Sequence, residues 1–314
     1  MTTTAPATSE FRALLTQVDK RRHRKDRTMR VLITGAFVLA TIPLVSVAWT
    51  VVSKGVKKLD AAFLTHSMRG VFGGVDAGGI YHAIIGTLEI TLFATLISVP
   101  IGLLAAVYLA EYGRGALARA VTFFVDVMTG IPSIVAGLFA YALFAVFFGP
   151  GVRMGVVGSV ALSVLMVPVV VRSSEEMLRL VPNELREAAF ALGVPKALVV
   201  VKVVLRTAVA GIATGITLAV ARVMGETAPL LITVGTIDSI NYHLFDGRMM
   251  TLPVFVYQQY QQGLVPCTPG DASCVATINY DRAWAAALTL IVLVMLLNLI
   301  ARLITRFFAP KNLG

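Results

Sequence analysis

The stretch VPNELREAAFALGVPKALVVVKVVLR, residues 181–206, separates two long apolar runs and carries clear helix signals. Asn183 is suited to cap a helix, and Glu184 suits the positive end of the helix dipole. Gly193, followed by Pro195, is typical of a helix end. The sequence therefore predicts a short helix over about residues 183–193, in a polar connection between apolar segments.

This predicted helix has one apolar face. Leu185, Ala188, Ala189 and Leu192 follow the spacing i, i+3, i+4, i+7, which places them together along one side of a helix. The alanines allow another backbone or a groove to approach closely. Two interpretations remain open: the face packs on the rest of its own chain, or it docks into a groove of another protein.

The flanking runs are those of a membrane protein. The chain is 57% hydrophobic and 14% charged, with a mean hydropathy of +0.82. Six segments are long enough to cross a bilayer and carry few or no charges. They cover residues 31–52, 81–110, 121–149, 154–171, 207–237 and 283–301. We expect an all-α protein with six transmembrane helices, the first an uncleaved signal-anchor helix because its apolar run is too long for a cleaved signal peptide.

The distribution of basic residues predicts the orientation. With the N-terminus inside, the inner segments hold 19 Lys and Arg residues and the outer loops hold 7, leaving Arg222 within a helix. The positive-inside rule then places both termini in the cytoplasm. The basic run KRRHRKDR, residues 20–27, precedes an apolar span directly, so we expect no nucleic-acid partner.

Both cysteines of the chain fall in one outer loop. Cys267 and Cys274 lie in VPCTPGDASCVA, where the Pro-Gly pair favours a turn. The extracytoplasmic side of a membrane permits disulfides, so we expect a bridge between them, the alternative being two free thiols. No histidine stands beside them, and we expect no metal site.

The stretch EAAFALG, residues 187–193, resembles the EAA-x3-G signature of ABC-importer permeases, and it precedes the fifth span of a six-span unit, as in that family. Its matching residues are Glu187, Ala188, Ala189 and Gly193. The resemblance implies a type I ABC-importer (MetI-like) permease fold and a coupling helix that docks into a groove of a separate ATPase subunit. The signature usually ends in Ile-x-Leu-Pro, whereas this chain has Arg206 in place of the proline.

Four further stretches together are similar to the A-type permease of the Pst phosphate-import system. They are GGIYHAIIGTLEIT (78–91), PIGLLAAVYLAEYG (100–113), GIPSIVAGL (130–138) and GETAPLL (225–231). This resemblance implies a second, C-type permease subunit, cytoplasmic ATP-binding subunits and an extracytoplasmic phosphate-binding protein as partners. The expected divisions are a cytoplasmic arm (1–29), a first transmembrane helix (30–52), an outer loop (53–80), a permease core (81–308) with a cysteine loop at about 238–282, and a cytoplasmic tail (309–314).

Motifs of enzymes and cofactor sites are absent from the sequence. It contains no G-x-x-x-x-G-K-[S/T] phosphate-binding loop, so an ATPase must be a partner chain. Its four histidines are scattered, with no metal-ligand or catalytic-triad spacing. We therefore expect no cofactor and no catalytic residue.

Arg222 and Glu226 lie four residues apart inside an apolar run, so on a continuous helix they would share a face. A charge within a membrane helix costs about 2.5–3.5 kcal/mol and usually faces a polar interior. A guanidinium suits phosphate oxygens, and Glu226 would either neutralise Arg222 or accept a hydrogen bond from a protonated phosphate. The alternative is an ion pair that clamps two helices.

Glu89 and Ser133 are further candidates for the substrate pathway, whereas Asp126 is a weaker one because it lies near a span end where a carboxylate meets water. We expect Pro132 and Pro229 to kink their helices. The sequence thus predicts an alternating-access permease for inorganic phosphate. The alternatives are a permease for molybdate or sulfate, a channel or secondary transporter without an ATPase, and a membrane-bound regulatory component that senses phosphate supply.

Overall fold

A computed structural model describes residues 20–270 and 273–308 of the chain, with side chains for 24–270 and 273–305. Contacts divide the chain into two units after Ser53, and each unit is described by itself. In unit 1 the described residues belong to one helix, α2 (Lys20–Gly55), which continues to the boundary. None of the residues in its most apolar 18-residue window is buried by protein, as expected of a helix that contacts lipid.

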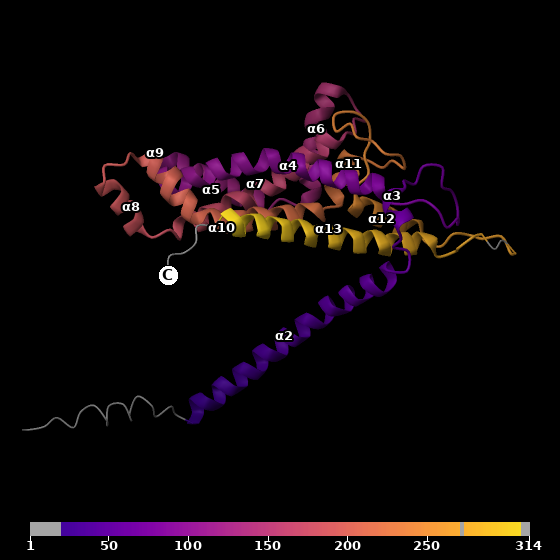
Figure 1. Cartoon of the computed structure of the whole chain (residues 1–314), viewed down its shortest axis with the longest axis horizontal. Coiled ribbons are helices and arrows are strands. Elements are labelled where there is room, and N and C mark those ends of the chain that lie inside the picture. The colour runs from indigo at the N-terminus through magenta and orange to yellow at the C-terminus, as the bar shows by residue number, and fades with distance from the viewer. Residues whose placement is uncertain (1–19, 271–272, 309–314) are drawn as a thin grey trace, which may run out of the picture. The chain divides into compact units, whose positions relative to one another are not determined.

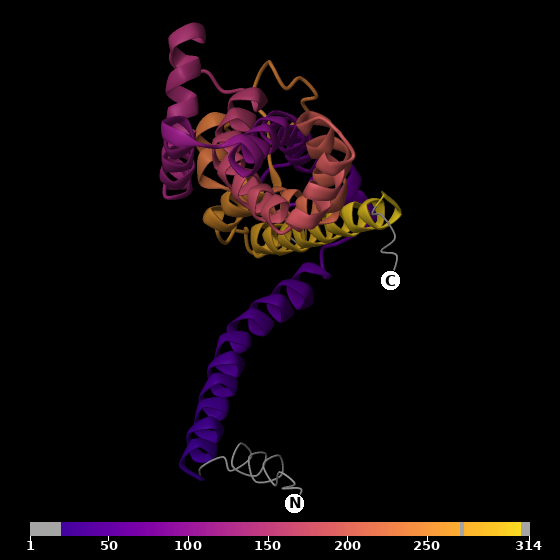
Figure 2. The same cartoon turned by 90° about the vertical axis from the view of Figure 1, so that its left-hand side faces the viewer.

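Unit 2, Lys54–Gly314, consists of helices packed mostly along one another (Figures 1 and 2). Its described elements in chain order are α3 (Ala61–Thr65), α4 (Tyr81–Val107), the π-helix η1 (Tyr108–Tyr112), α5 (Gly115–Thr129), α6 (Ser133–Phe148), α7 (Gly155–Arg179), α8 (Asn183–Ala191), α9 (Lys196–Val199), the π-helix η2 (Val200–Val204), α10 (Leu205–Met224), α11 (Ala228–Thr233), α12 (Leu252–Gln262) and α13 (Ile278–Phe308).

The core forms where α4, α7 and α10 approach closely, because small residues line their contacts. Gly102 of α4 faces Val170 of α7, where a Cβ would stand 2.7 Å from the valine Cγ1. The Ser159 hydroxyl of α7 donates a hydrogen bond of 3.0 Å to the Ile90 carbonyl of α4. Gly215 of α10 contacts the Ser173 side chain in the same way. In a membrane the hydrophobic effect does not drive helices together, because lipid tails are as apolar as the side chains. Close packing of small residues and hydrogen bonds between helices stabilise their association instead.

Five helices of the described residues are long and apolar enough to cross a membrane, and a bent pair makes a sixth span. The pair is α5 and α6, which meet at 108° around a break at Gly130–Pro132. The expected third span over residues 121–149 corresponds to this bent pair, which begins earlier, at Gly115. The expected kink at Pro132 is a complete break, because proline removes a backbone donor and cannot continue the preceding helix.

The fifth span differs from the sequence expectation in the same way. The sequence predicted one helix over residues 207–237, whereas α10 ends at Met224 and α11 begins at Ala228. The chain turns at Gly225–Thr227, where the Gly225 and Glu226 amides donate to the Arg222 and Val223 carbonyls. The span also begins earlier, because Lys196–Met224 forms one continuous helical stretch that includes η2.

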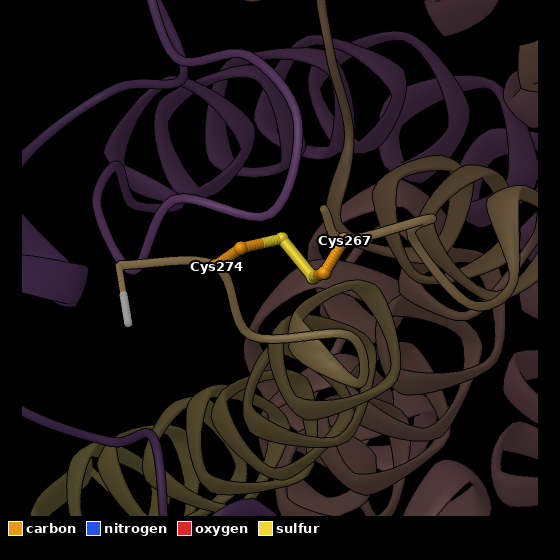
Figure 3. The surroundings of a disulfide bond; sticks show 2 residues. All are labelled: Cys267 and Cys274. Carbon is orange, nitrogen blue, oxygen red and sulfur yellow. A yellow bond between two sulfur atoms is a disulfide. The ribbon is translucent and has the colours of Figure 1, made fainter. Parts of the chain in front are cut away.

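The two ends of unit 2 hold its principal connections (Figure 1). One end, called here the α8 end, carries α8 and α9. The other, the disulfide end, carries the loop between α12 and α13, in which Cys267 and Cys274 are joined by a disulfide with a Cα–Cα distance of 5.7 Å (Figure 3). Helix α13 extends along the unit between these ends.

Candidate functional site

The two broken helices of unit 2 pack against each other. Gly137 of α6 faces Pro229 of α11 so closely that a Cβ on the glycine would stand 2.7 Å from the proline Cα. A break inside a membrane leaves backbone groups outside the helical pattern, which is tolerated only where protein covers them or where they line an aqueous cavity. The α5–α6 and α10–α11 breaks therefore mark the position in this unit best suited to a substrate pathway.

Arg222 and Glu226 lie beside the α10–α11 break, and the structure separates them. Arg222 is in the last turn of α10, whereas Glu226 follows Gly225 in the turn, so the two do not share a helix face. Arg222 is exposed and Glu226 half-buried. Within the described residues, no carboxylate oxygen lies within 4.0 Å of the Arg222 guanidinium. Two of the expected roles required an ion pair between these residues: neutralisation of Arg222 by Glu226, and a clamp between two helices. Neither ion pair is formed in this conformation.

The other two pathway candidates lie on separate elements. Ser133 is the first residue of α6, directly after the break, and is half-buried. Glu89 lies in α4 with one buried carboxylate oxygen, Oε2, that has no hydrogen-bond partner. In the described part of the chain, no hydrogen bond or ion pair joins Glu89, Ser133, Arg222 and Glu226 to one another. Their grouping as one pathway remains a prediction.

Asp126, expected near a span end where a carboxylate meets water, lies near the end of α5 with an exposed side chain, and it also forms an ion pair. The exposed Asp126 carboxylate of α5 accepts a hydrogen bond from Arg172 of α7. Arg172 also contacts Glu175 at 3.2 Å, and Arg179 contacts the same glutamate at 2.8 Å. Glu175, whose side chain is 8% exposed, thus lies between two arginines. This network ties the broken third span to α7 on the α8 side of the break.

Sequence reasoning missed Arg172, Glu175 and Arg179, although a signal was present. Their spacing of three and four residues brings opposite charges together on one side of a helix. The local pattern was sufficient to predict the Glu175 contacts. It was not sufficient for the bond to Asp126, because that partner lies 46 residues away in another helix.

Helix α8 is held to its own unit by one arginine. The Arg186 side chain, 15% exposed, bonds with Nε and Nη2 to the Glu111 carboxylate of η1, at 3.1 and 2.9 Å. Its Nη2 also donates to the Leu178 carbonyl at 2.8 Å, and its Nη1 donates to the Val181 carbonyl. Sequence reasoning missed both members of this pair, which lie 75 residues apart.

The predicted apolar face of α8 is divided by the fold. Ala189 is buried, 8% exposed, in a cluster with Leu178 and Val199. The other three members, Leu185, Ala188 and Leu192, are exposed, so the face does not pack as a whole on its own chain. Leu192 lies just beyond the end of α8 rather than within it.

The ends of α8 match the expected signals only in part. Gly193 has a φ of +75° and follows the helix, as a C-terminal glycine should. Asn183, expected to cap the helix, is its first residue and makes no capping bond; its carboxamide oxygen accepts from Arg186 at 3.2 Å instead. Glu184 and Glu187 of α8 are both exposed.

Comparison with known proteins agrees with this arrangement. Residues 98–313 match the family of binding-protein-dependent transport system inner membrane components. A phosphate transport system permease protein PstA 1 of Mycobacterium tuberculosis is 45% identical over 93% of this chain and 92% of its own length. The corresponding permease of Mycobacterium leprae is 43% identical over 95% of this chain and 94% of its own length. That of Pasteurella multocida is 36% identical over 92% of this chain and 98% of its own length.

The chain belongs to the PstA family of transport system permeases. It is a multi-pass membrane protein of the ABC-importer permease class and not itself an enzyme. Its fold is shared with solved permeases of low sequence identity. The methionine transporter MetNI in inward-facing conformations matches with a TM-score of 0.53 at 22% identity, over 74% of this chain and 95% of the other. A bacterial alginate ABC transporter matches with a TM-score of 0.60 at 13% sequence identity, over 91% of this chain and 96% of the other.

Proposed function

We propose that this chain is the A-type permease subunit of an ATP-driven importer of inorganic phosphate in a bacterial inner membrane. Its relatives at 36–45% identity are named as phosphate transport system permeases. The observation that carries the assignment within the molecule is Arg222, an arginine without a carboxylate partner beside the break of a membrane helix. A guanidinium in that position offers a bidentate site for a tetrahedral oxyanion.

The proposed transport cycle uses two partner chains besides the ATP-binding subunits. A second permease of C type completes the pore, and an extracytoplasmic phosphate-binding protein delivers the anion. Arg222 contacts the phosphate, Glu226 accepts a hydrogen bond from its protonated oxygen, and Ser133 and Glu89 line the same path. With the charge bias of 19 to 7 applied to the loops, both termini and α8 lie in the cytoplasm, and the disulfide lies outside.

The coupling to ATP is assigned to α8. Leu185, Ala188 and Leu192 form an exposed apolar surface next to the exposed Glu184 and Glu187. We assign this surface, called here the coupling surface, to a groove of the ATP-binding subunit. The buried Arg186–Glu111 pair fixes α8 to the end of α4, so a movement of α8 displaces the helices of the pore rather than α8 alone.

The test is phosphate uptake by the complete transporter in reconstituted vesicles. We expect Arg222→Gln to lower the uptake rate roughly 100-fold, because a charge-assisted contact is worth about 3 kcal/mol. Arg222→Lys should lower it roughly tenfold, since an ammonium cannot reproduce the bidentate fork. Arg119→Gln, which removes an exposed arginine of α5, is the matched control and should leave uptake unchanged.

A double variant separates a substrate contact from a structural ion pair. Arg222→Gln with Glu226→Gln should transport no better than Arg222→Gln alone, because the anion still lacks its cation. Uptake restored to near the normal rate in the double variant would contradict the assignment. If unlabelled sulfate or molybdate inhibits the uptake of labelled phosphate as strongly as unlabelled phosphate does, the choice of substrate is wrong. Uptake that does not depend on ATP would favour a channel or secondary transporter.

A further inference from the structure

The disulfide end of unit 2 contains a pocket of about 390 Å³ that the transport assignment above does not use. Its walls come from four segments of the chain. They are the loop before α4, the loop after α11, the C-terminal half of α12, and the start of α13 with the chain that leads to it. We call it the Arg282 pocket, after the charged side chain in its wall.

Arg282 is a buried cation without a carboxylate partner. It is 2% exposed, and none of the described carboxylates lies within 4.0 Å of its guanidinium. Its Nη2 donates to the Val75 and Ala77 carbonyls, at 2.7 and 2.9 Å, while its Nε has no hydrogen-bond partner. Asp76, between those two carbonyl residues, forms its ion pair with Lys58 and acts on Arg282 only through space, without a hydrogen bond. A buried charge in this condition favours an anionic ligand.

The same pocket holds acceptors that have no donor. The carboxamide oxygens of Gln258 and Gln259 are buried and unpartnered, and Gln259 is 4% exposed. The exposed carboxylate of Asp238 also lines the pocket. A ligand that satisfies these groups must accept a hydrogen bond from Arg282 and donate one to an oxygen. A protonated phosphate does both, whereas a sulfate ion has no proton to donate.

The disulfide braces the wall of the Arg282 pocket. Leu264, Val265 and Pro266 line the pocket immediately before Cys267. Val265 donates its amide to the Ala276 carbonyl at 2.9 Å, just beyond Cys274. The loop is therefore closed twice, by the bridge and by this bond.

The braced loop also holds the segment that positions Arg282. The Val275 amide donates to the Gly74 carbonyl at 2.8 Å, and Cys274 pairs with Val75, whose carbonyl accepts from Arg282. A Cβ on Gly74 would stand 2.3 Å from the Cys274 sulfur, so only glycine permits this approach. The bridge thus fixes the loop against the acceptor of the buried guanidinium.

We propose that the Arg282 pocket is a second phosphate-binding site, separate from the Arg222 position and selective for a protonated oxyanion. It rests on the proposed function for the identity of its ligand and for its placement on the extracytoplasmic side. There it holds the anion between the phosphate-binding protein and the pore. Arg282 supplies the charge, the two glutamine oxygens and Asp238 offer acceptors for the O–H groups of a protonated phosphate, and the bridged loop closes the wall.

The experiment measures equilibrium binding of radiolabelled inorganic phosphate to the complete transporter in lipid nanodiscs, without the phosphate-binding protein. All variants carry Arg222→Gln, which removes the pathway contact. We expect phosphate binding to persist in this background, and Gln259→Glu to weaken it at least about tenfold, because a carboxylate in the wall of the Arg282 pocket repels the anion. Gln261→Glu is the matched control: it is the same change at an exposed position of α12 outside the pocket, and binding should stay unchanged.

The Gln259→Glu change distinguishes a phosphate-binding site from a purely structural role of Arg282. A carboxylate in the wall of the Arg282 pocket supplies a counter-ion for the guanidinium, so a structural role in which Arg282 only holds the Val75 loop would tolerate it. Gln262→Glu, at an exposed position in the pocket wall, gives the same test in a variant whose folding is not at risk, with at least about a threefold loss expected.

Unchanged phosphate affinity in both pocket variants overturns the proposal, as does displacement of the label by sulfate as readily as by phosphate. Absence of phosphate binding in the Arg222→Gln background overturns it as well. Any of these three results, together with phosphate-specific uptake by the unmodified transporter, would mean that the Arg282 pocket is assigned wrongly while the proposed function stands.

Discussion

Arg186 at the α8 end and Arg282 at the disulfide end are both largely buried, yet their surroundings differ. Arg186 bonds to the Glu111 carboxylate and to backbone carbonyls, so its charge is neutralised by its own chain. Among the described residues, Arg282 bonds to two carbonyls, and its Nε has no partner there. The difference between the two arginines is that one is neutralised by a carboxylate of its own chain, whereas the other is the group to which we assign a ligand.

Ala188→Asp tests the α8 end with the largest expected effect. Ala188 is exposed in this chain, so the charge does not disturb the fold, but it would be buried without a partner in the groove of an ATPase. We expect ATP-driven phosphate uptake to fall by about 100-fold or more, since burying an unpaired charge costs several kcal/mol. The measurement is uptake in vesicles, together with the amount of ATPase that co-purifies with the permease.

Ala189→Asp is the matched comparison for that variant. Ala189 is buried within its own unit, so the same change should lower the stability of the permease itself. Normal uptake by Ala188→Asp, with a full complement of ATPase, would show that the coupling surface is assigned wrongly.

Removal of one partner from the Arg186–Glu111 joint should cost stability at the α8 end. Arg186→Met leaves a buried carboxylate without compensation, for which we expect a loss of about 3–5 kcal/mol. Arg186→Met with Glu111→Gln should recover most of that loss. Thermal unfolding of the purified permease complex measures both, and a double variant as unstable as Arg186→Met would mean that the pair is not coupled.

The smallest effect is expected from the bridge at the disulfide end. Closing the short loop between Cys267 and Cys274 should stabilise it by about 2 kcal/mol. Alkylation without reductant, followed by mass spectrometry, should find no modified cysteine, and two alkylated thiols would refute the bridge. Replacing both cysteines by serine should weaken phosphate binding in the Arg282 pocket while leaving ATPase co-purification unchanged, which sharpens the contrast between the ends.

Local sequence patterns predicted the fold class and the membrane-spanning segments, because each span is a continuous apolar run. They indicated kinks at Pro132 and Pro229 but not that the helices end there. Each of the runs 121–149 and 207–237 is apolar enough overall to be taken as one span, although Glu226 lies in the turn of the second run. Proline and glycine at 130–132, and Gly225 before Pro229, were signals of the breaks, but their effect depends on packing such as that of Gly137 on Pro229.

The candidate site was predictable only where its contacts are local. The exposed part of α8 followed from helical spacing, and the burial of Ala189 did not, because that depends on Leu178 and Val199 from neighbouring elements. The prediction that Arg222 and Glu226 share a face was wrong, since it assumed a helix that continues past Gly225. Arg282 drew no attention because nothing near it in sequence shows that the loop around Val75 covers it.

The π-helix η1 has a consequence for the evolution of the joint at the α8 end. A π-turn accommodates one more residue than an α-turn, and such turns inside helices are often found at functional sites. Glu111 lies within η1 and reaches Arg186 from there. A single-codon deletion between Tyr108 and Glu111 would restore a regular helix with little rotation of the carboxylate, because three residues of α-helix turn the chain by about as much as four residues of π-helix. The π-turn therefore lets this segment gain or lose one residue while Glu111 still faces Arg186.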